Sequence, residues 1–153
     1  TNVHGLNQQL YRIIPRTIIY LKKEKKIELH GGGKTVRSFL HVRDVVQGMI
    51  KVLEKGKIGD IFHMSPDYPE ISIENLVKLI CNLMNQDFEN SIKRVSNNFG
   101  QDENYKINSS KIKNELGWSA KITLEDGIQE TIKWLENNWK EINKLSHEYN
   151  HIK

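Results

Sequence analysis

Residues 26–44 carry the pattern that decides the fold: KIELHGGGKTVRSFLHVRD. Apolar and polar residues alternate over 26–30 and again over 36–42, which predicts two short β-strands. Three consecutive glycines, 31–33, lie between them and predict a turn. The alternation in the second strand divides its side chains between two faces, with Val36, Ser38, Leu40 and Val42 on one and Arg37, Phe39 and His41 on the other.

The glycines precede Lys34 and Thr35, so residues 31–35 have the letters that end a phosphate-binding P-loop. That loop needs a glycine five positions before its last one, and this sequence has Glu28 there. It also needs a helix directly after the Lys-Thr pair, so that backbone N–H groups face the phosphates. Because a strand pattern follows instead, we interpret 31–33 as a hairpin-like turn between two strands and not as a P-loop.

Helical periodicity and capping residues predict about five helices around this region. In chain order they are 15–26, opened by Pro15; 45–55, capped by Asp44 and ended by Gly56; 73–86, capped by Ser72; a short helix capped by Asn108 or Ser109 and ended by Gly117; and 124–145, with a capping-box start at Thr123 and Asp126.

Three or four short strands complete the predicted elements. Residues 59–65, GDIFHMS, are mostly apolar and predict a buried strand. Residues 87–104 are polar and predict a loop with one short strand at 92–95. Alternating strands and helices of this kind predict a small α/β domain.

Length and composition fit one soluble domain. The 153 residues are 27% charged and 37% hydrophobic, with a net charge of +4. No apolar run reaches the roughly 18 residues of a membrane span, and there is no signal-peptide pattern. The single cysteine, Cys81, excludes an internal disulfide and favours the reducing cytoplasm. We read the N-terminus, which lacks Met, as a cut inside a longer chain.

The charge pattern and the histidines bear on partners. Basic residues are scattered, and the run LKKEKK has no interleaved aromatics, so we expect no nucleic-acid site. Six histidines show no metal-ligand spacing, so we expect no metal. Arg37, on a strand face with Phe39 and His41, is either a solvated strand residue or a phosphate clamp, because a guanidinium pairs two phosphate oxygens at once. The pattern alone leaves both open.

Taken in order, these segments resemble the C-terminal, substrate-binding part of the extended short-chain dehydrogenases of the NAD-dependent epimerase/dehydratase family, most closely the dTDP-glucose 4,6-dehydratases. They cover residues 1 to about 140 and are TNVHG, YRIIPRTI, IELHGGGKTVRSFLHVRDVV, GDIFHMS and the closing block FGQDENYKINSSKIKNELGWSAKITLEDGIQETIKW. The resemblance implies part of an extended Rossmann-type fold, with 1–146 binding the substrate, 147–153 as a frayed tail, and the NAD-binding half absent.

The resemblance also implies site residues for a nucleotide-diphosphate sugar. Asn2 would contact the sugar-diphosphate end and Arg37 would clamp the diphosphate. The segment from Arg12 to Pro15 and the 28–30 strand would line the base and ribose. The implied substrate-binding residues are Asn2, Arg12, Ile14, Pro15, Glu28, His30, Arg37, His63, Asn98 and Tyr105, with no catalytic residue among them.

Several positions depart from the family pattern. Asn98 stands where the family has a phosphate-binding arginine, and Arg94 is the nearest replacement. His4 and Leu6 replace a tyrosine and a proline, and His63 replaces an asparagine. These changes affect the expected binding of the base and the diphosphate more than they affect the fold.

The family's dinucleotide fingerprint and its catalytic Tyr-x-x-x-Lys pair would lie upstream of residue 1. The letters of that pair occur at Tyr149 and Lys153, in the predicted frayed tail, and we treat them as coincidence. We therefore expect NAD in the complete enzyme only, and neither NAD binding nor turnover by this chain alone. The alternatives are a nucleotide-sugar 4-epimerase, a non-catalytic nucleotide-sugar or partner-binding module, and a basic nucleic-acid binder.

Overall fold

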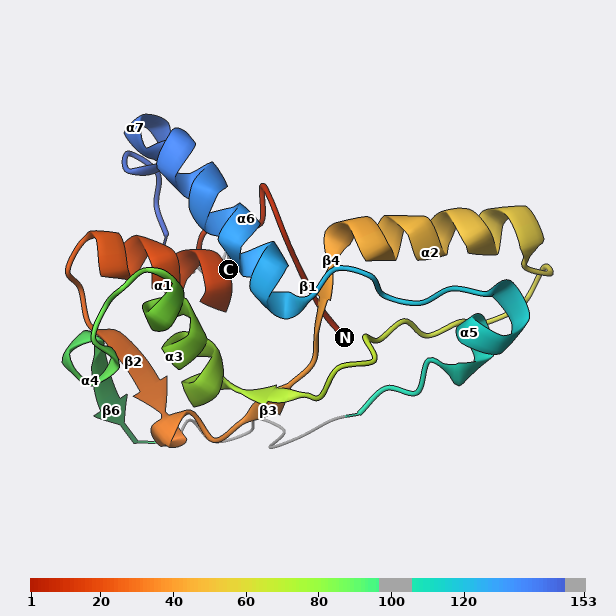
Figure 1. Ribbon diagram of the computed structural model, residues 1–153, viewed down its shortest axis with the longest axis horizontal. Helices are drawn as coiled ribbons and strands as arrows, with labels where there is room; N and C mark the ends of the chain where they lie inside the picture. Colours follow the sequence, from red (N-terminus) through yellow and green to blue (C-terminus); the bar gives the residue numbers. More distant parts are fainter. Residues whose placement is uncertain (97–105, 148–153) are drawn as a thin grey trace, which may run out of the picture.

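The protein consists of two lobes of unequal size, as the computed structural model shows for residues 1–96 and 106–147 (Figure 1). The larger lobe holds most of the helices, and the smaller lobe is built from one long and one short helix. The helical elements are α1 (Ile13–Lys22), the 3-10 turn η1 (Gly31–Gly33), α2 (Val42–Lys55), α3 (Ile73–Leu83), α4 (Phe88–Ser91), α5 (Ser110–Leu116), α6 (Leu124–Asn137) and α7 (Trp139–Ile142).

Short strands pair two by two. The first pair is parallel and places Asn2 opposite Phe39 and His4 opposite His41. The second pair is also parallel, and the third is antiparallel. The pairs are β1 (Asn2–His4) with β4 (Phe39–His41), β2 (Ile27–His30) with β6 (Ile92–Val95), and β3 (Val36–Arg37) with β5 (Ile71–Ser72).

The predicted single strand over 36–42 is in fact two strands that belong to different sheets. Arg37 pairs with Ile71 in one sheet, and Phe39 pairs with Asn2 in another. Ser38, between them, is buried, and its carbonyl accepts a hydrogen bond from the Asn2 N–H at 3.0 Å. The glycine turn is confirmed, but the hairpin is wrong because β2 pairs with β6 and not with β3.

The larger lobe packs its helices around one apolar cluster. Ile18 and Ile19 of α1 meet Ile80 of α3 and Ile128 of α6, and all four are buried. Helix α1 begins at Ile13, two residues before the predicted start. Pro15 fits this third helical position because the first four N–H groups of a helix have no intrahelical acceptor.

The smaller lobe has its own apolar cluster, in which Leu40 and Trp118 are buried. Helix α2 packs on it and is capped by His41, whose side chain accepts a hydrogen bond from the Arg43 N–H. The prediction that Asp44 caps this helix is wrong. Asp44 lies in the first turn of the helix instead, and its side chain is buried. Its Oδ2 accepts a hydrogen bond from the Ile122 N–H at 3.0 Å.

Several predicted boundaries are confirmed. Ser72 caps α3, and Gly117 ends α5 in a left-handed conformation. Thr123 caps α6, with its hydroxyl accepting from the Asp126 N–H. The last helix is divided at Asn138, whose backbone N–H and side-chain amide both donate to the Trp134 carbonyl, at 3.1 Å and 2.8 Å.

The predicted buried strand at 59–65 is wrong. This segment forms no ladder with any described strand, and the Ile61 side chain is 74% exposed. A strand pattern describes side chains that suit a sheet, but the strand itself requires a neighbour to pair with.

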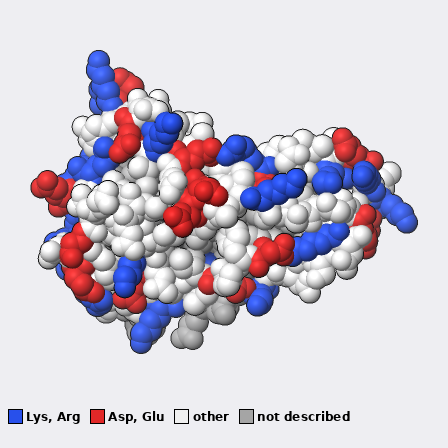
Figure 2. Space-filling view, in the orientation of Figure 1, with Lys and Arg blue, Asp and Glu red and all other residues white. Residues whose placement is uncertain are grey.

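The surface charges and the lengths of the helices agree with the mixed charge and the short apolar runs of the sequence. On the face shown in Figure 2, Lys and Arg are interspersed with Asp and Glu. Among the described residues, none of the helices has both the length and the apolar character that a bilayer crossing requires.

Two neighbouring glycines give a matched test of the turn. Gly33 and Gly32 both have φ near +70°, but a Cβ on Gly33 would lie 2.8 Å from the Glu74 backbone nitrogen, whereas a Cβ on Gly32 meets nothing within 4 Å. Gly33→Ala is expected to lower the free energy of unfolding by about 2 kcal/mol and Gly32→Ala by about 1 kcal/mol. Urea denaturation of both variants measures the difference. Equal losses would show that α3 does not press on the turn.

Candidate functional site

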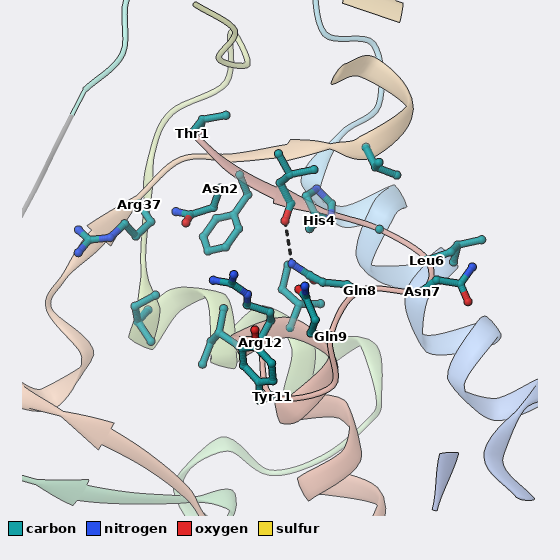
Figure 3. Close-up of a pocket in the computed structure, with 17 residues that line it drawn as sticks. Thr1, Asn2, His4, Leu6, Asn7, Gln8, Gln9, Tyr11, Arg12 and Arg37 are labelled. Carbon is teal, nitrogen blue, oxygen red and sulfur yellow. Dashed lines mark hydrogen bonds between the residues drawn. The ribbon is translucent and has the colours of Figure 1, made fainter. Parts of the chain in front are cut away.

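A cavity of about 900 Å³ lies against the first fourteen residues (Figure 3). Strand β1 and the turn after it form one wall, and the N-terminus of α1 forms another. Arg37 and Phe39 close a third side. The cavity therefore lies where β1, the β3–β4 junction and α1 meet.

The lining of this cavity mixes apolar and polar side chains, and its described residues carry no carboxylate. Arg12 and Arg37 contribute two guanidinium groups, and none of the described lining residues is Asp or Glu. Side-chain amides add neutral donors and acceptors. They come from Asn2, Asn7, Gln8 and Gln9. An electropositive, amide-rich cavity of this size suits a small polar anion.

Helix α1 strengthens this preference. Ile13 and Ile14, its first two residues, line the cavity, and no side chain caps the helix. The first turn contains no acidic residue either. Backbone N–H groups at such an end carry partial positive charge and favour a bound anion.

The two arginines differ in orientation. Arg12 is exposed, and its guanidinium carbon lies 5.4 Å from the centre of the Tyr11 ring. Arg37 is half-buried, and its Nη1 donates to the Val36 carbonyl at 2.8 Å. In Figure 3 the Arg37 guanidinium extends away from Asn2 and Arg12, along the rim of the cavity. A ligand held by both arginines therefore requires rotation of the Arg37 side chain.

Gln8 is a lining residue that sequence reasoning missed. Its Nε2 donates to the Val3 carbonyl at 2.7 Å, which fixes the amide. Its Oε1 is buried and has no donor among the described protein groups. The signal that could have identified it is the polar run NQQ at 7–9, which lies between Leu6 and Leu10.

A pair of buried histidines lies beside the cavity. His4 lines it, and the rings of His4 and His41 meet edge to face with centres 5.3 Å apart. Neither ring nitrogen of His4 has a described hydrogen-bond partner. Burial, reinforced by His41, lowers the pKa of His4 to about 4. His4 is therefore uncharged at neutral pH.

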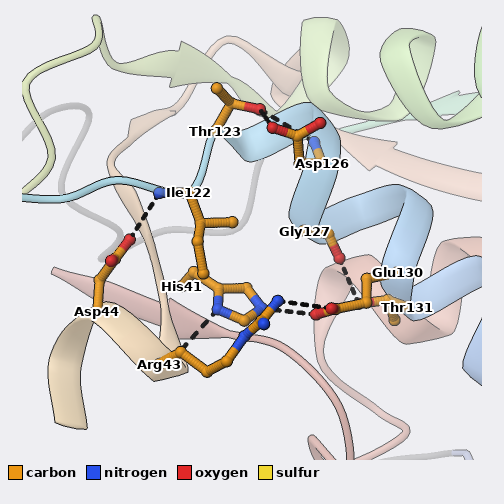
Figure 4. A network of polar contacts seen from close by, with 9 residues as sticks. All are labelled: His41, Arg43, Asp44, Ile122, Thr123, Asp126, Gly127, Glu130 and Thr131. Carbon is orange, nitrogen blue, oxygen red and sulfur yellow. Dashed lines mark hydrogen bonds and ion pairs between the residues drawn. The ribbon is translucent and has the colours of Figure 1, made fainter. Parts of the chain in front are cut away.

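The second histidine belongs to a polar network (Figure 4). His41 Nδ1 accepts from the Arg43 N–H, so its proton resides on Nε2, which lies 3.2 Å from Glu130 Oε2. Burial lowers the pKa of His41, and Glu130 opposes that shift. Gly127 lies under both rings, since a Cβ there would come within 2.5 Å of His4 Cε1. The sequence gives no sign that these histidines meet.

Comparison with known proteins decides the family. Residues 3–131 match the family described as GDP-mannose 4,6 dehydratase. The chain belongs to this family. The chain is 34% identical to the dTDP-D-glucose 4,6-dehydratase of Homo sapiens over 152 residues, covering 94% of this chain and 43% of the relative. It is 35% identical to a trifunctional UDP-glucose 4,6-dehydratase of Arabidopsis thaliana, covering 90% of this chain and 20% of that one.

Comparison with solved structures agrees with this result. The dTDP-glucose 4,6-dehydratase of Bacillus anthracis, in complex with NAD, superposes with a TM-score of 0.83 at 34% identity, over 91% of this chain and 43% of that one. A UDP-glucose 4-epimerase of Thermotoga maritima superposes with a TM-score of 0.82 at 22% identity, which shows a shared fold. This chain thus matches the C-terminal part of dTDP-glucose 4,6-dehydratase-like enzymes and spans less than half of their length.

The structure brings together some of the predicted site residues of this dehydratase-family chain and separates others. Asn2, Arg12, Ile14 and Arg37 line the large cavity. Pro15 is buried in α1 and does not line it. Asn98 and Tyr105 lie outside the described residues.

The remaining predicted residues lie elsewhere. Glu28 and His30 are exposed on β2 and line a second cavity of about 300 Å³, together with Arg16 of α1. His63 is exposed in the segment that was predicted to be a strand. The two cavities lie against different parts of α1. The large cavity contacts its first turn, and the second cavity contacts its middle.

Arg94, considered as a replacement phosphate ligand, is held in ion pairs away from the large cavity. Its guanidinium donates to Glu89 at 2.8 Å and to Glu74 at 3.1 Å. These two carboxylates raise the pKa of Arg94 above its ordinary value, Glu89 being the larger cause. The side chain is thus already neutralised by its neighbours.

Proposed function

We propose that this chain forms the nucleotide-sugar-binding part of an NAD-dependent nucleotide-sugar 4,6-dehydratase. The observation that carries the proposal is the cavity of about 900 Å³ that has two arginines and no described carboxylate in its lining. A diphosphate bridges two guanidinium groups well, because each one offers paired N–H donors. The amides of Asn2, Gln8 and Gln9 offer donors and acceptors to sugar hydroxyls.

The dehydratase assignment rests on identity. The human and Arabidopsis thaliana dehydratases share 34–35% sequence identity with this chain, whereas the Thermotoga maritima epimerase shares 22%. We therefore propose that the complete protein dehydrates its hexose, and we assign to this chain the binding and orientation of the substrate. The buried, free Cys81 fits the cytoplasmic location that we propose.

The glycine run does not form a dinucleotide-binding turn. Gly31–Gly33 lead into a strand and not a helix, so no helix N-terminus follows them to receive a pyrophosphate. Gly33 is instead pressed against the Glu74 backbone. NAD supplies hydride chemistry where it is bound, and we propose that it binds outside this chain.

Calorimetric titration of the chain with dTDP-, UDP-, GDP- and CDP-glucose tests the proposal. We expect one nucleotide sugar to bind at least tenfold more tightly than the weakest of the four, because a base in a shaped site is discriminated by its hydrogen bonds. We expect no heat with NAD. Equal weak heats for all four sugars, or tight NAD binding, would contradict the proposal.

A further inference from the structure

His4 is a titratable group in the wall of the large cavity, and the binding of an anion there would change its charge. The residue lines the cavity and is only 1% exposed. Neither of its ring nitrogens has a hydrogen-bond partner among the described residues. Buried polar atoms normally have such a partner, because burial without one is unfavourable. The protonation of His4 is therefore not fixed by a hydrogen bond and depends on the charges around the ring.

The groups that touch the ring are uncharged. The rings of Phe39 and His41 meet it edge to face, with centres 6.4 Å and 5.3 Å away. On the side of α6, a Cβ on Gly127 would lie 2.5 Å from His4 Cε1, so the helix backbone closes this side against water. A proton on His4 is thus poorly solvated, and burial is the main cause that lowers its pKa to about 4.

The charged groups farther out do not compensate for a proton on His4. Glu130 of α6 lies 3.2 Å from His41 Nε2 and 2.5 Å from Arg43 Nη2, so Arg43 already balances its charge (Figure 4). Asp44 of α2 accepts a hydrogen bond from the Ile122 N–H. The charged side chains that line the cavity itself are cationic, and in the described lining they are Arg12 and Arg37.

An anion in the cavity reverses this balance. Negative charge close to a histidine favours the protonated ring, so a bound anion raises the pKa of His4 toward its ordinary value of 6.5. We propose that His4 takes up a proton when an anion occupies the large cavity, so that the anion binds more tightly as the pH falls. The two effects are reciprocal, because each ligand, proton or anion, changes the affinity for the other by the same factor. The inference rests on the proposed function in taking the anion to be the diphosphate of a nucleotide sugar.

NMR of the histidine rings tests the inference directly. Spectra are recorded between pH 5 and 8 without ligand and with dTDP-glucose, whose diphosphate is a diester and keeps its charge over this range. The His4 signals are assigned from their loss in His4→Gln. We expect the His4 ring to stay neutral down to pH 5 without ligand and to titrate within this range when dTDP-glucose is bound. Sulfate, an anion without base or sugar, serves as a second probe and should act in the same direction.

The same coupling should appear in the affinity measured by calorimetry. We expect the chain to bind dTDP-glucose roughly tenfold more tightly at pH 5.5 than at pH 7.5, which is the factor that linkage gives when the ordinary pKa of His4 is restored. His4→Gln should lose most of this pH dependence. His30→Gln, at an exposed histidine that lines the second cavity, should keep it. Circular dichroism at both pH values shows whether each variant is folded, and the wild-type NMR titration decides the question if His4→Gln is not.

Two results would overturn the inference. The first is a His4 ring that stays neutral down to pH 5 although dTDP-glucose is bound, which would leave the proposed function standing. The second is affinity that weakens as the pH falls. If the chain does not bind dTDP-glucose but sulfate still causes His4 to titrate between pH 5 and 8, the proposed function is refuted and the coupling of His4 to an anion is supported.

Discussion

Replacing Arg12 and Arg37 together by alanine is expected to weaken binding of the preferred nucleotide sugar at least 100-fold. Each guanidinium is expected to make charge-assisted hydrogen bonds to the diphosphate, which contribute about 1.5–3 kcal/mol apiece. Each single variant should therefore lose roughly tenfold or more in affinity, since 1.4 kcal/mol corresponds to a factor of ten. Calorimetric titration measures all three variants.

Arg94→Ala is the matched control for this series. Arg94 is an arginine of the same lobe, and Glu74 and Glu89 already neutralise it. Its removal should leave the dissociation constant unchanged. An effect of Arg94→Ala as large as that of Arg37→Ala would mean that the diphosphate lies near β6 and not in the large cavity. If the double variant binds the nucleotide sugar with wild-type affinity, neither arginine contributes to the site.

Acidification is expected to destabilise the protein through His4. The pKa of His4 is about 4 in the folded chain and 6.5 when unperturbed, so the unfolded chain binds the extra proton between these values. Stability from the neutral, buried ring is complete above pH 6.5 and is lost as pH falls toward 4. The shift corresponds to about 3 kcal/mol. The titratable group that faces His4 is the His41 ring. The charged side chains of Glu130 and Arg43 lie beside His41.

Urea denaturation between pH 4 and 7.5 measures this effect. His4→Gln keeps a polar side chain but cannot take up the proton. It should reduce the pH dependence of the free energy of unfolding over that range by close to one proton. His30→Gln, at an exposed histidine on β2, serves as the control and should leave the slope as it is. A slope that His4→Gln does not change would show that other groups account for the acid sensitivity.

Local signals predicted the helices well. Ser72, Gly117 and Thr123 mark boundaries because a cap depends on backbone groups within a few residues of it. The same reasoning failed at Asp44, whose carboxylate finds a partner 78 positions away in the Ile122 N–H. His41 then takes the cap, and a sequence offers no rule for choosing between two such neighbours.

Non-local pairing was the main source of error in the fold. The alternation over 36–42 is real, but it does not show that the chain changes sheet at Ser38. The apolar pattern of 59–65 likewise describes side chains that would suit a sheet, but the structure forms no strand there.

The candidate site was partly predictable. Asn2, Arg12 and Arg37 share one cavity, as the resemblance to the family implies. Glu28 and His30 do not, because β2 presents their side chains to the second cavity. Gln8 enters the site through the turn after β1, whose path no periodicity describes, and His4 enters it from the end of β1.

The central claim is that the cavity between β1 and the start of α1 receives the nucleotide sugar. Titrating ¹⁵N-labelled protein with dTDP-glucose, and recording amide chemical shifts, tests it most directly. We expect the largest changes at Asn2, Gln8, the α1 amides at 13 and 14, and Arg37. Changes confined to Arg16, Glu28 and His30, which line the second cavity, or no change at saturating ligand, would contradict it.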